Sequence, residues 1–338
     1  MTPRAQIDAV RQQQLAREQR LAAAVAVLAL RAEHELTAFL TEHRHAWATM
    51  PPPDQQTLLQ RGLIQNLMAL VASVFTLLAL QVTPLITDAK RQSALAGASD
   101  ALIVASALGI SATLTALTPQ EIATLAGRTT TGIGIPAQYV SLIPALQVRL
   151  RDTLDTRAAQ QWGLRQTQHA VTRDIQLTTR EHAVVIARQE SWQSYGAGLV
   201  RTYQANEDVL SGWTWFSQRD EYTCLSCLML DGHTFPLETP FAPNHAACRC
   251  EAIPIVRDSP VDRGESGEDW FTRQPVATQR AMMGDAAYRL YAHGIITLHD
   301  LMQTTTTEQG TFHTVKSLKT LVNDGRITAA QYRAALHP

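Results

Sequence analysis

All four cysteines of this 338-residue chain lie between positions 224 and 250, and this cluster constrains the fold more than any other feature. Cys224 and Cys227 form a C-x2-C pair, Cys248 and Cys250 form a C-x-C pair, and His245 lies just ahead of the second pair. A secreted protein stapled by disulfides would scatter its cysteines through the fold. Two close pairs of sulfur ligands, with or without an imidazole, suit one tetrahedral zinc ion.

A closed site with four protein ligands leaves no position for water, so the predicted zinc has a structural role. The sequence leaves open which four of the five candidates bind, because C-x-C is a less common half-site than C-x2-C. One or two disulfides, or four ordinary buried thiols, are the alternatives. A catalytic zinc is not indicated, because the chain has neither an H-E-x-x-H helix nor the H-x-E and P-C-x-x-C pattern of zinc deaminases.

Strand and turn signals surround the cysteines. Trp213 to Phe216 is a short aromatic run typical of a strand, and Cys250 to Val256 has the pattern of a closing strand. Asp231-Gly232 predicts a turn, because both residues tolerate the backbone angles that turns require. A module of this size has a thin apolar core, so a bound ion would contribute much of its folding free energy.

Aromatic and charged residues complete the expected module. Trp213, Trp215 and Trp270 are expected to pack in its core or at its edge. Arg249 lies between two candidate ligands and is expected to pair with Asp220 or Asp231. Contact between Arg249 and a partner molecule is the alternative interpretation.

The chain on both sides of this module has helical patterns. No Gly or Pro occurs between Arg4 and Met50, and Pro51 to Pro53 then ends the first predicted helix. Thr118-Pro119-Gln120-Glu121 predicts another helix start, with a Thr cap and Pro at the first position. The predicted helical stretches are 4–48, 55–82, 88–116, a short helix from 119, 137–207, and 268 onward with several breaks, one of them at Thr304 to Thr307.

These patterns predict a mainly α protein with a small α+β zinc-binding module. We expect an elongated helical region over residues 1–210, a compact Cys-rich module over 211–257, and a helical C-terminal tail over 258–338.

Composition narrows the class of protein. Twenty-nine basic residues against 30 acidic ones give a net charge of -1, which excludes a globally basic nucleic-acid binder. The polar first twenty residues do not predict a signal peptide. Leu67 to Val82 and Ala101 to Ala116 are apolar, but a spanning helix needs about 20 residues and Gln81 interrupts the first run. Both runs are therefore expected to be buried helices, with a membrane hairpin as the minority alternative.

The cysteine segment carries a longer motif. It reads W-x-W-F-S-x-x-D-x-x-T-C-x-x-C-x-x-L-D-G-x-x-F over 213–235, followed by P-x-H-x-x-C-R-C over 243–250. Ile186-Ala187-Arg188-Gln189-Glu190 lies upstream, and a helical pattern from Trp270 to Leu301 lies downstream. Together these blocks resemble the C-terminal domain of the Mu F-like head morphogenesis family, which are phage minor head proteins. The resemblance covers residues 180–302.

The resemblance implies a structural minor head protein of a tailed phage or prophage, without catalytic residues. Such a protein would lie in the head interior near the portal, and in the host cytoplasm during assembly. Its implied partners are the portal protein and the major capsid or scaffold proteins, with several copies around the portal. It would aid head morphogenesis, with DNA packaging or ejection, and contact with packaged DNA, as further implied roles.

Two other functions remain as alternatives to head assembly. One is a toxin or effector enzyme, because Mu F-like domains are sometimes fused to toxin domains. The other is a membrane-active protein ejected with the DNA, which would use the apolar segments 63–86 and 101–116.

Overall fold

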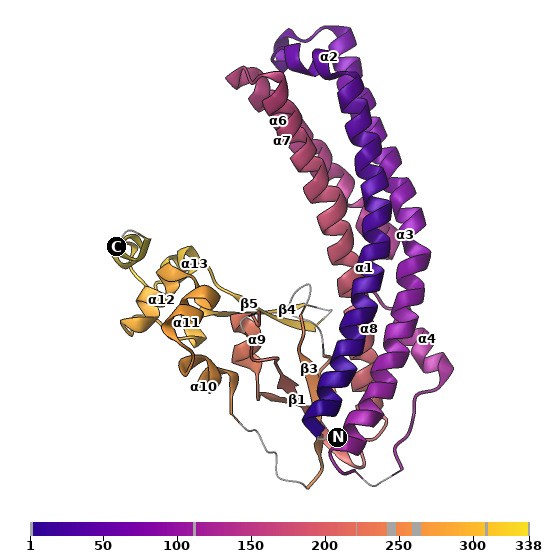
Figure 1. Ribbon diagram of the computed structural model, residues 1–338, viewed down its shortest axis with the longest axis vertical. Helices are drawn as coiled ribbons and strands as arrows, with labels where there is room; N and C mark the ends of the chain where they lie inside the picture. The colour runs from indigo at the N-terminus through magenta and orange to yellow at the C-terminus, as the bar shows by residue number, and fades with distance from the viewer. Residues whose placement is uncertain are drawn as a thin grey trace. The chain divides into compact units, whose positions relative to one another are not determined.

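Helices account for most of the computed structural model, which describes residues 3–110, 113–220, 222–241, 248–258, 265–307 and 310–336 (Figure 1). In the first two-thirds of the chain the elements are α1 (Pro3–Glu42), α2 (Arg44–Thr49), the 3-10 turn η1 (Pro53–Gln55), α3 (Leu58–Ala107), α4 (Pro119–Gly127), α5 (Ile135–Val140), α6 (Leu142–Gln160), α7 (Leu164–Gln176), the π-helical segment η2 (Leu177–Glu181) and α8 (His182–Gln204).

Strands appear only after α8 in the described part of the chain. The elements that follow are β1 (Leu210–Phe216), α9 (Leu225–Leu230), β2 (Thr234–Phe235), β3 (Glu251–Val256), α10 (Gly267–Thr272), α11 (Val276–Met283), α12 (Asp285–Ala292), the 3-10 turn η3 (His299–Leu301), β4 (Met302–Thr307), β5 (Gly310–Val315), α13 (Leu318–Asn323) and α14 (Ala329–Leu336). The mainly α class with a small α+β part is therefore confirmed.

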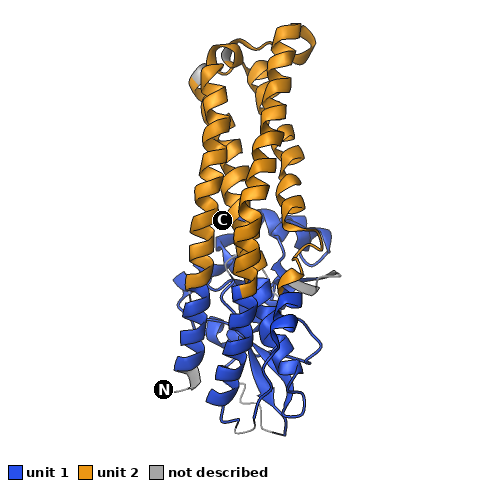
Figure 2. Cartoon of the chain, turned by 90° about the vertical axis from the view of Figure 1, so that its right-hand side faces the viewer, with its two compact units in different colours: residues 1–15, 92–125, 192–338 blue, residues 16–91, 126–191 orange. Residues whose placement is uncertain are grey.

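The chain forms two compact units (Figure 2). Unit 1 consists of residues 1–15, 92–125 and 192–338, and unit 2 of residues 16–91 and 126–191. The predicted segments 1–210, 211–257 and 258–338 follow chain order, whereas each unit is assembled from separate stretches. Those segment boundaries stay a prediction.

Unit 2 is a bundle in which parts of α1, α3, α6, α7 and α8 share one apolar core (Figure 1). On α3, buried side chains recur at helical spacing, as in Leu67, Val71, Phe75, Leu78 and Val82. This stripe shares its core with the buried leucines of α1 and α6, which are Leu21, Leu36, Leu40, Leu146, Leu150 and Leu154. The bundle therefore follows from the apolar periodicity of its helices.

Two helices predicted to be separate, 55–82 and 88–116, join in one helix, α3. The second prediction extends too far, because α3 ends at Ala107 and residues 113–116 are not helical. Pro84 lies inside α3, where it removes one backbone hydrogen bond. Its ring is exposed, whereas Val82 and Ile86 on either side are completely buried in the core of unit 2. Burial of these neighbours holds the helix together across the proline.

Within the described residues, α3 is the one helix long and apolar enough to cross a membrane by length and composition. Of its most apolar 18-residue window, 39% is buried.

A buried polar network also lies inside unit 2. The side chains of Lys90 on α3 and Glu190 on α8 are almost inaccessible, and their Nζ and Oε2 atoms lie 2.5 Å apart. The other carboxylate oxygen of Glu190 accepts hydrogen bonds from the Thr130 backbone N–H and from Gln138 Nε2, both at 2.8 Å. Lys90 also donates to the carbonyl of Arg128. This network ties the loop between α4 and α5 to the long helices.

The sheet of unit 1 has the order β2-β1-β3 and is antiparallel throughout. Trp213 of β1 lies opposite Phe235 of β2 and Pro254 of β3. The strands predicted at Trp213 to Phe216 and Cys250 to Val256 are thus confirmed. Trp213 and Trp215 are buried in the core beside this sheet, and Trp270 is half-buried in the tail.

The tail is helical as predicted, except in one place. The threonine run 304–307, predicted to be a break between helices, belongs to β4, which pairs with β5 as an antiparallel hairpin. Threonine is β-branched and favours extended backbone, and pairing with β5 satisfies the backbone groups of the run.

Candidate metal centre

Three cysteine sulfurs converge inside unit 1. The Sγ atoms of Cys227, Cys248 and Cys250 all lie within 4.8 Å of one another. The distance between the sulfurs of Cys227 and Cys248 is 3.8 Å. All three residues are almost completely buried.

Local structure positions the first pair. Cys224 is the N-cap of α9, and its sulfur accepts a hydrogen bond from the backbone N–H of Cys227 at 3.4 Å. A cap residue and the residue three positions later lie on the same side of a helix start. The C-x2-C spacing therefore directs both sulfurs to one side of the first turn of α9.

The second pair reaches the same place through the sheet. Cys250 directly precedes β3, whose Glu251 lies opposite Phe216 at the end of β1. The C-x-C spacing puts Cys248 two residues further out, beyond the paired part of the strand. The α9 turn and the beginning of β3 thus bring the two pairs together.

The distances fit a metal ion better than a disulfide. In tetrahedral zinc sites the Zn–S bond is about 2.3 Å, which places neighbouring sulfurs about 3.8 Å apart. A disulfide bond needs about 2.05 Å. The four cysteines are free thiols in the structure. The residues present therefore fit a metal with sulfur ligands.

The protonation of the cluster follows from its surroundings. Hydrogen bonds with the thiols of Cys224, Cys248 and Cys250, together with burial, raise the pKa of Cys227 well above its usual value. Burial is the main reason that the pKa of Cys250 is raised as well. Without a cation the sulfurs of Cys227 and Cys250 keep their protons, and a bound metal would have to displace them.

Three of the five predicted ligands are thus brought together. Cys224 is half-buried and contacts the cluster through its hydrogen bonds with Cys227. His245 lies outside the described residues. The complete ligand set, Cys224, Cys227, Cys248 and Cys250 with or without His245, stays a prediction.

An ion pair beside the cluster holds the loop before α9. Arg249 donates from both terminal nitrogens to Asp220, at 2.7 and 2.5 Å, so the predicted pairing of Arg249 is confirmed with Asp220. Asp220 also accepts from the Thr223 hydroxyl at 2.9 Å and the Tyr222 backbone N–H at 3.1 Å. Burial acts to raise the pKa of Asp220, but hydrogen bonds from Arg249 and Thr223 outweigh it and lower that pKa.

A second carboxylate stabilises the turn after α9. The Asp231 side chain is fully buried, accepts from the Ser217 backbone N–H at 2.9 Å, and pairs with Arg219. Gly232 follows with a φ of +84°, a conformation that favours glycine. The predicted turn at Asp231-Gly232 is present, and its aspartate also connects two segments of the module.

Sequence reasoning missed the polar groups behind the sulfurs. Glu251, next to Cys250, is completely buried, and burial raises its pKa to about 8, although Arg11 acts to lower it. Tyr203 on α8 donates its hydroxyl to the carbonyl of Ala252 at 2.8 Å. The sequence signal for this polar group is Glu251 itself, a charged residue at the end of the C-R-C-E run. The residues that surround it come from helices distant in sequence, so local patterns do not reveal the group.

Comparison with known proteins bears on this same region. Residues 154–253 match the family model described as Phage Mu protein F like protein. This stretch of the chain is Mu F-like. The Mu F-like segment contains α7, α8, the sheet as far as Ile253, and all four cysteines. Comparisons with curated proteins and with solved structures gave no match.

Proposed function

We propose that the chain is a structural head-morphogenesis protein of a tailed phage or prophage, with a zinc ion that stabilises its Cys-rich module. One observation carries the proposal: the four cysteines lie inside the Mu F-like segment, and three of them converge in a buried cluster. The role requires no turnover, so we assign no catalytic residue.

Zinc is the metal that this donor set favours. Thiolates select soft or borderline metals, and zinc commonly takes four Cys or Cys and His ligands in closed structural sites. Cys227, Cys248 and Cys250 would supply three ligands, and Cys224 or His245 the fourth. The ion would join the first turn of α9 to the start of β3.

A position in the head interior near the portal agrees with the surface of unit 2. Leu77, Leu80 and Leu85 on α3 are each at least 40% exposed, and no charged residue occurs between Arg61 and Asp88. Exposed apolar surface on this scale marks sites that other molecules cover. The portal protein and the major capsid or scaffold proteins are the partners that we propose, with several copies of the chain per particle.

Particle composition tests this function. In a phage that carries the gene, Cys248→Ser should lower both the zinc content of the purified chain and its incorporation into particles, measured by mass spectrometry of purified virions. Ser211→Ala is the control, because it removes an exposed hydroxyl from β1 of the same module and leaves all four sulfurs and their contacts. Normal incorporation of a zinc-free variant would contradict the role of the metal, and absence of the wild-type chain from particles would contradict the assembly function.

The length and apolar character of α3 favour a second candidate function, a membrane-active protein ejected with the DNA. Flotation of the full chain with anionic liposomes tests it. Co-flotation that Leu77→Glu and Leu80→Glu abolish would support this candidate over assembly.

A further inference from the structure

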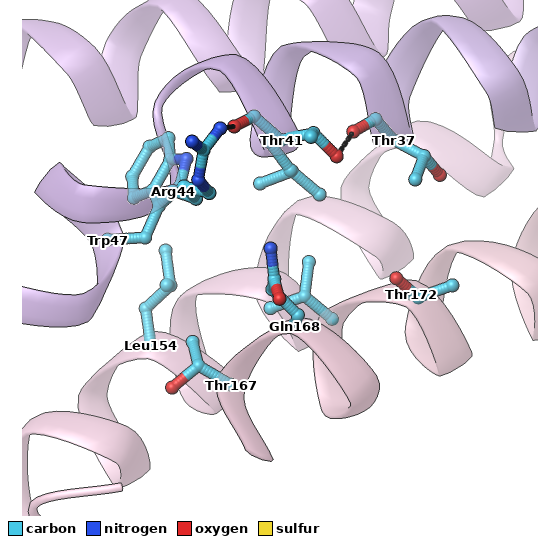
Figure 3. A pocket seen from close by; sticks show the side chains of 10 residues that line it. Thr37, Thr41, Arg44, Trp47, Leu154, Thr167, Gln168 and Thr172 are labelled. Atoms are coloured by element: carbon cyan, nitrogen blue, oxygen red, sulfur yellow. Dashed lines mark hydrogen bonds between the residues drawn. The ribbon is translucent and has the colours of Figure 1, made fainter. Parts of the chain in front are cut away.

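Unit 2 contains a cavity of about 270 Å³, where the side chains of Thr37, Thr41 and Arg44 lie opposite those of Gln168 and Thr172 (Figure 3). The Thr41 hydroxyl donates to the Thr37 carbonyl at 2.8 Å, and Arg44 donates to the Thr41 carbonyl at 3.2 Å. These rim groups bond to one another, so the lining favours no particular ligand. In unit 1, by contrast, a buried hydrogen-bond donor lies beside the sulfur cluster itself.

Two indoles on the same strand differ in their hydrogen bonding. Trp213 and Trp215 both belong to β1, and both are almost completely buried. Trp213 Nε1 donates to the carbonyl of Thr239 at 3.1 Å. Trp215 Nε1 is also shielded from water, but it makes no well-formed hydrogen bond within the described part of the chain. A buried N–H without an acceptor costs free energy, so the position of Trp215 calls for an acceptor.

The sheet places Trp215 next to Cys250. Trp215 lies opposite Ala252 of β3, and Cys250 comes two residues before Ala252. Side chains two positions apart on a strand point to the same face, and a diagonal neighbour across a strand pair is within reach of a long aromatic side chain. Trp215 and Cys250 accordingly belong to one buried cluster, which also contains Cys227 and Cys248.

Backbone hydrogen bonds hold the indole in this position. The Trp215 N–H donates to the carbonyl of His233, and the Trp215 carbonyl accepts from the Gly232 N–H, both at 2.8 Å. Gly232 and His233 form the turn after α9, the helix that contains Cys227. Trp215 is therefore anchored to both segments that supply the sulfurs, the α9 turn and the start of β3.

The indole already acts on the Cys250 thiol. Burial is the main influence and raises the pKa of Cys250, whereas hydrogen bonding with Cys227 and with the Trp215 indole acts to lower it. A neutral thiol is a weak acceptor, and a charged sulfur accepts much more strongly. The Trp215 N–H therefore gains a good acceptor when Cys250 ligates a cation.

We propose that Trp215 is a positioning residue of the metal centre, whose indole N–H donates to the Cys250 sulfur when that sulfur binds the ion. The inference rests on the metal site of the proposed function and adds a donor behind one of its ligands. Donor and acceptor lie in the same buried cluster, so the bond needs no opening to solvent. It also accounts for the contrast with Trp213, whose N–H already has a carbonyl acceptor.

NMR of the full chain loaded with cadmium-113 tests the hydrogen bond directly. Cadmium is a soft cation that takes thiolate ligands as zinc does, and its nuclear spin couples to a proton that is hydrogen-bonded to a ligating sulfur. The Trp215 indole proton should show this coupling. The Trp213 indole proton, which bonds to Thr239, should show none. Resonance assignment of the loaded wild-type chain identifies both protons, so the result does not depend on a variant that folds.

A pair of variants tests the effect on the metal. Trp215→Phe removes the N–H and should weaken zinc binding about tenfold, measured by competition with a chromogenic chelator. In the cobalt-loaded chain it should also move the sulfur-to-metal charge-transfer band to longer wavelength. Trp213→Phe is the matched control, because it removes an indole from the same strand whose acceptor is a carbonyl, and it should leave the band in place.

Metal uptake separates this inference from the proposed metal site. A full chain that takes up neither zinc nor cadmium overturns both. Cadmium uptake without coupling to the Trp215 indole proton, or equal changes in the two variants, overturns the role of Trp215 and leaves the metal site standing.

Discussion

Two buried polar regions of this chain differ in whether the chain itself supplies the partners of their polar groups. In unit 2, Lys90 and Glu190 are sequestered from water, and the carboxylate of Glu190 receives hydrogen bonds from Lys90, Thr130 and Gln138. In unit 1, the buried sulfurs of Cys227, Cys248 and Cys250 have one another as neighbours. The chain itself therefore satisfies the first region, and we propose that a cation completes the second.

The charges near the sulfurs support this distinction. Arg249 is the nearest arginine along the chain, but both of its terminal nitrogens bind Asp220. Contacts with the other thiols raise the pKa of Cys227, so the surrounding chain does not stabilise a thiolate there. Buried polar groups are tolerated when they are paired, and here an ion would provide the pairing.

The largest effect should come from removing the metal. Structural zinc contributes on the order of 10 kcal/mol to folding in small zinc modules, so stripping it should unfold β1, α9 and β3. Hydrogen–deuterium exchange of the full chain, before and after treatment with a zinc chelator, measures this change.

The network of Lys90 and Glu190 is the internal control for that experiment, because exchange of its backbone should not change. Slow exchange that persists at α9 in the metal-free chain would show that packing alone holds the sulfurs together, and the contrast between the two regions would disappear.

The second effect concerns the buried ion pair. Glu190→Ala leaves Lys90 buried without a partner and should lower the free energy of unfolding by about 3–5 kcal/mol. Urea denaturation at neutral pH measures it.

The double variant Lys90→Met with Glu190→Leu removes both charges and should recover part of that loss. Recovery should be incomplete, because the Thr130 N–H and Gln138 Nε2 lose Glu190 as their acceptor. If Glu190→Ala alone were as stable as the wild-type chain, water or another group would have to stabilise the buried charge of Lys90 in place of the carboxylate.

The third prediction concerns Asp231, a buried carboxylate of the Cys-rich module whose hydrogen bonds come from the chain itself. Asp231→Asn keeps the size of the side chain but loses the charge that pairs with Arg219, and it should cost about 1.5–3 kcal/mol in the metal-loaded protein. Chemical denaturation monitored by tryptophan fluorescence measures the loss.

In the metal-free chain, the same substitution should have almost no effect, because the module is already unfolded. If Asp231→Asn lowered the free energy of unfolding equally with and without metal, the contribution of Asp231 to stability would not depend on the ion.

The smallest effect should come from an exposed pair in the tail. Hydrogen bonds from Arg326 are the main reason that the pKa of Asp300 is lowered from its usual value. A lowered carboxylate pKa stabilises the fold fully above about pH 4, the pKa in the unfolded chain. This contribution declines as the pH falls below that value and is lost once the pH falls through the lowered pKa of the folded chain. Asp300→Asn should therefore lower the melting temperature slightly at pH 7 and by a smaller amount at pH 2.5. A larger difference at pH 2.5 would reverse the expected sign.

Much of the candidate site could be predicted from local patterns. The spacing of Cys224 and Cys227 predicts two sulfurs that share one site, and the aromatic run at Trp213 predicts a strand, because ligand spacing and side-chain alternation are short-range properties. The helix α9 that follows Cys224 was not predicted. The helix from Pro3 to Glu42 also follows from its composition, in which Gly is absent and Pro occurs only at the first position. The same argument predicts one helix over 4–48, whereas the structure interrupts it at His43 and continues as α2. The whole ligand set remains a prediction, since His245 lies outside the described residues.

Other features depend on residues that are distant in sequence. Pro84 lies inside one continuous helix because core packing on both sides outweighs the lost hydrogen bond, and the threonines of β4 form a strand because β5 supplies partners. From the sequence, Asp220 and Asp231 were two possible partners for Arg249. In the fold Arg249 pairs with Asp220, and Asp231 pairs with Arg219. Periodicity, capping and ligand spacing depend on residues that are close in sequence, so the sequence alone determines them. The partner of each buried charge depends on which distant segments the fold brings together, so only the tertiary structure decides it.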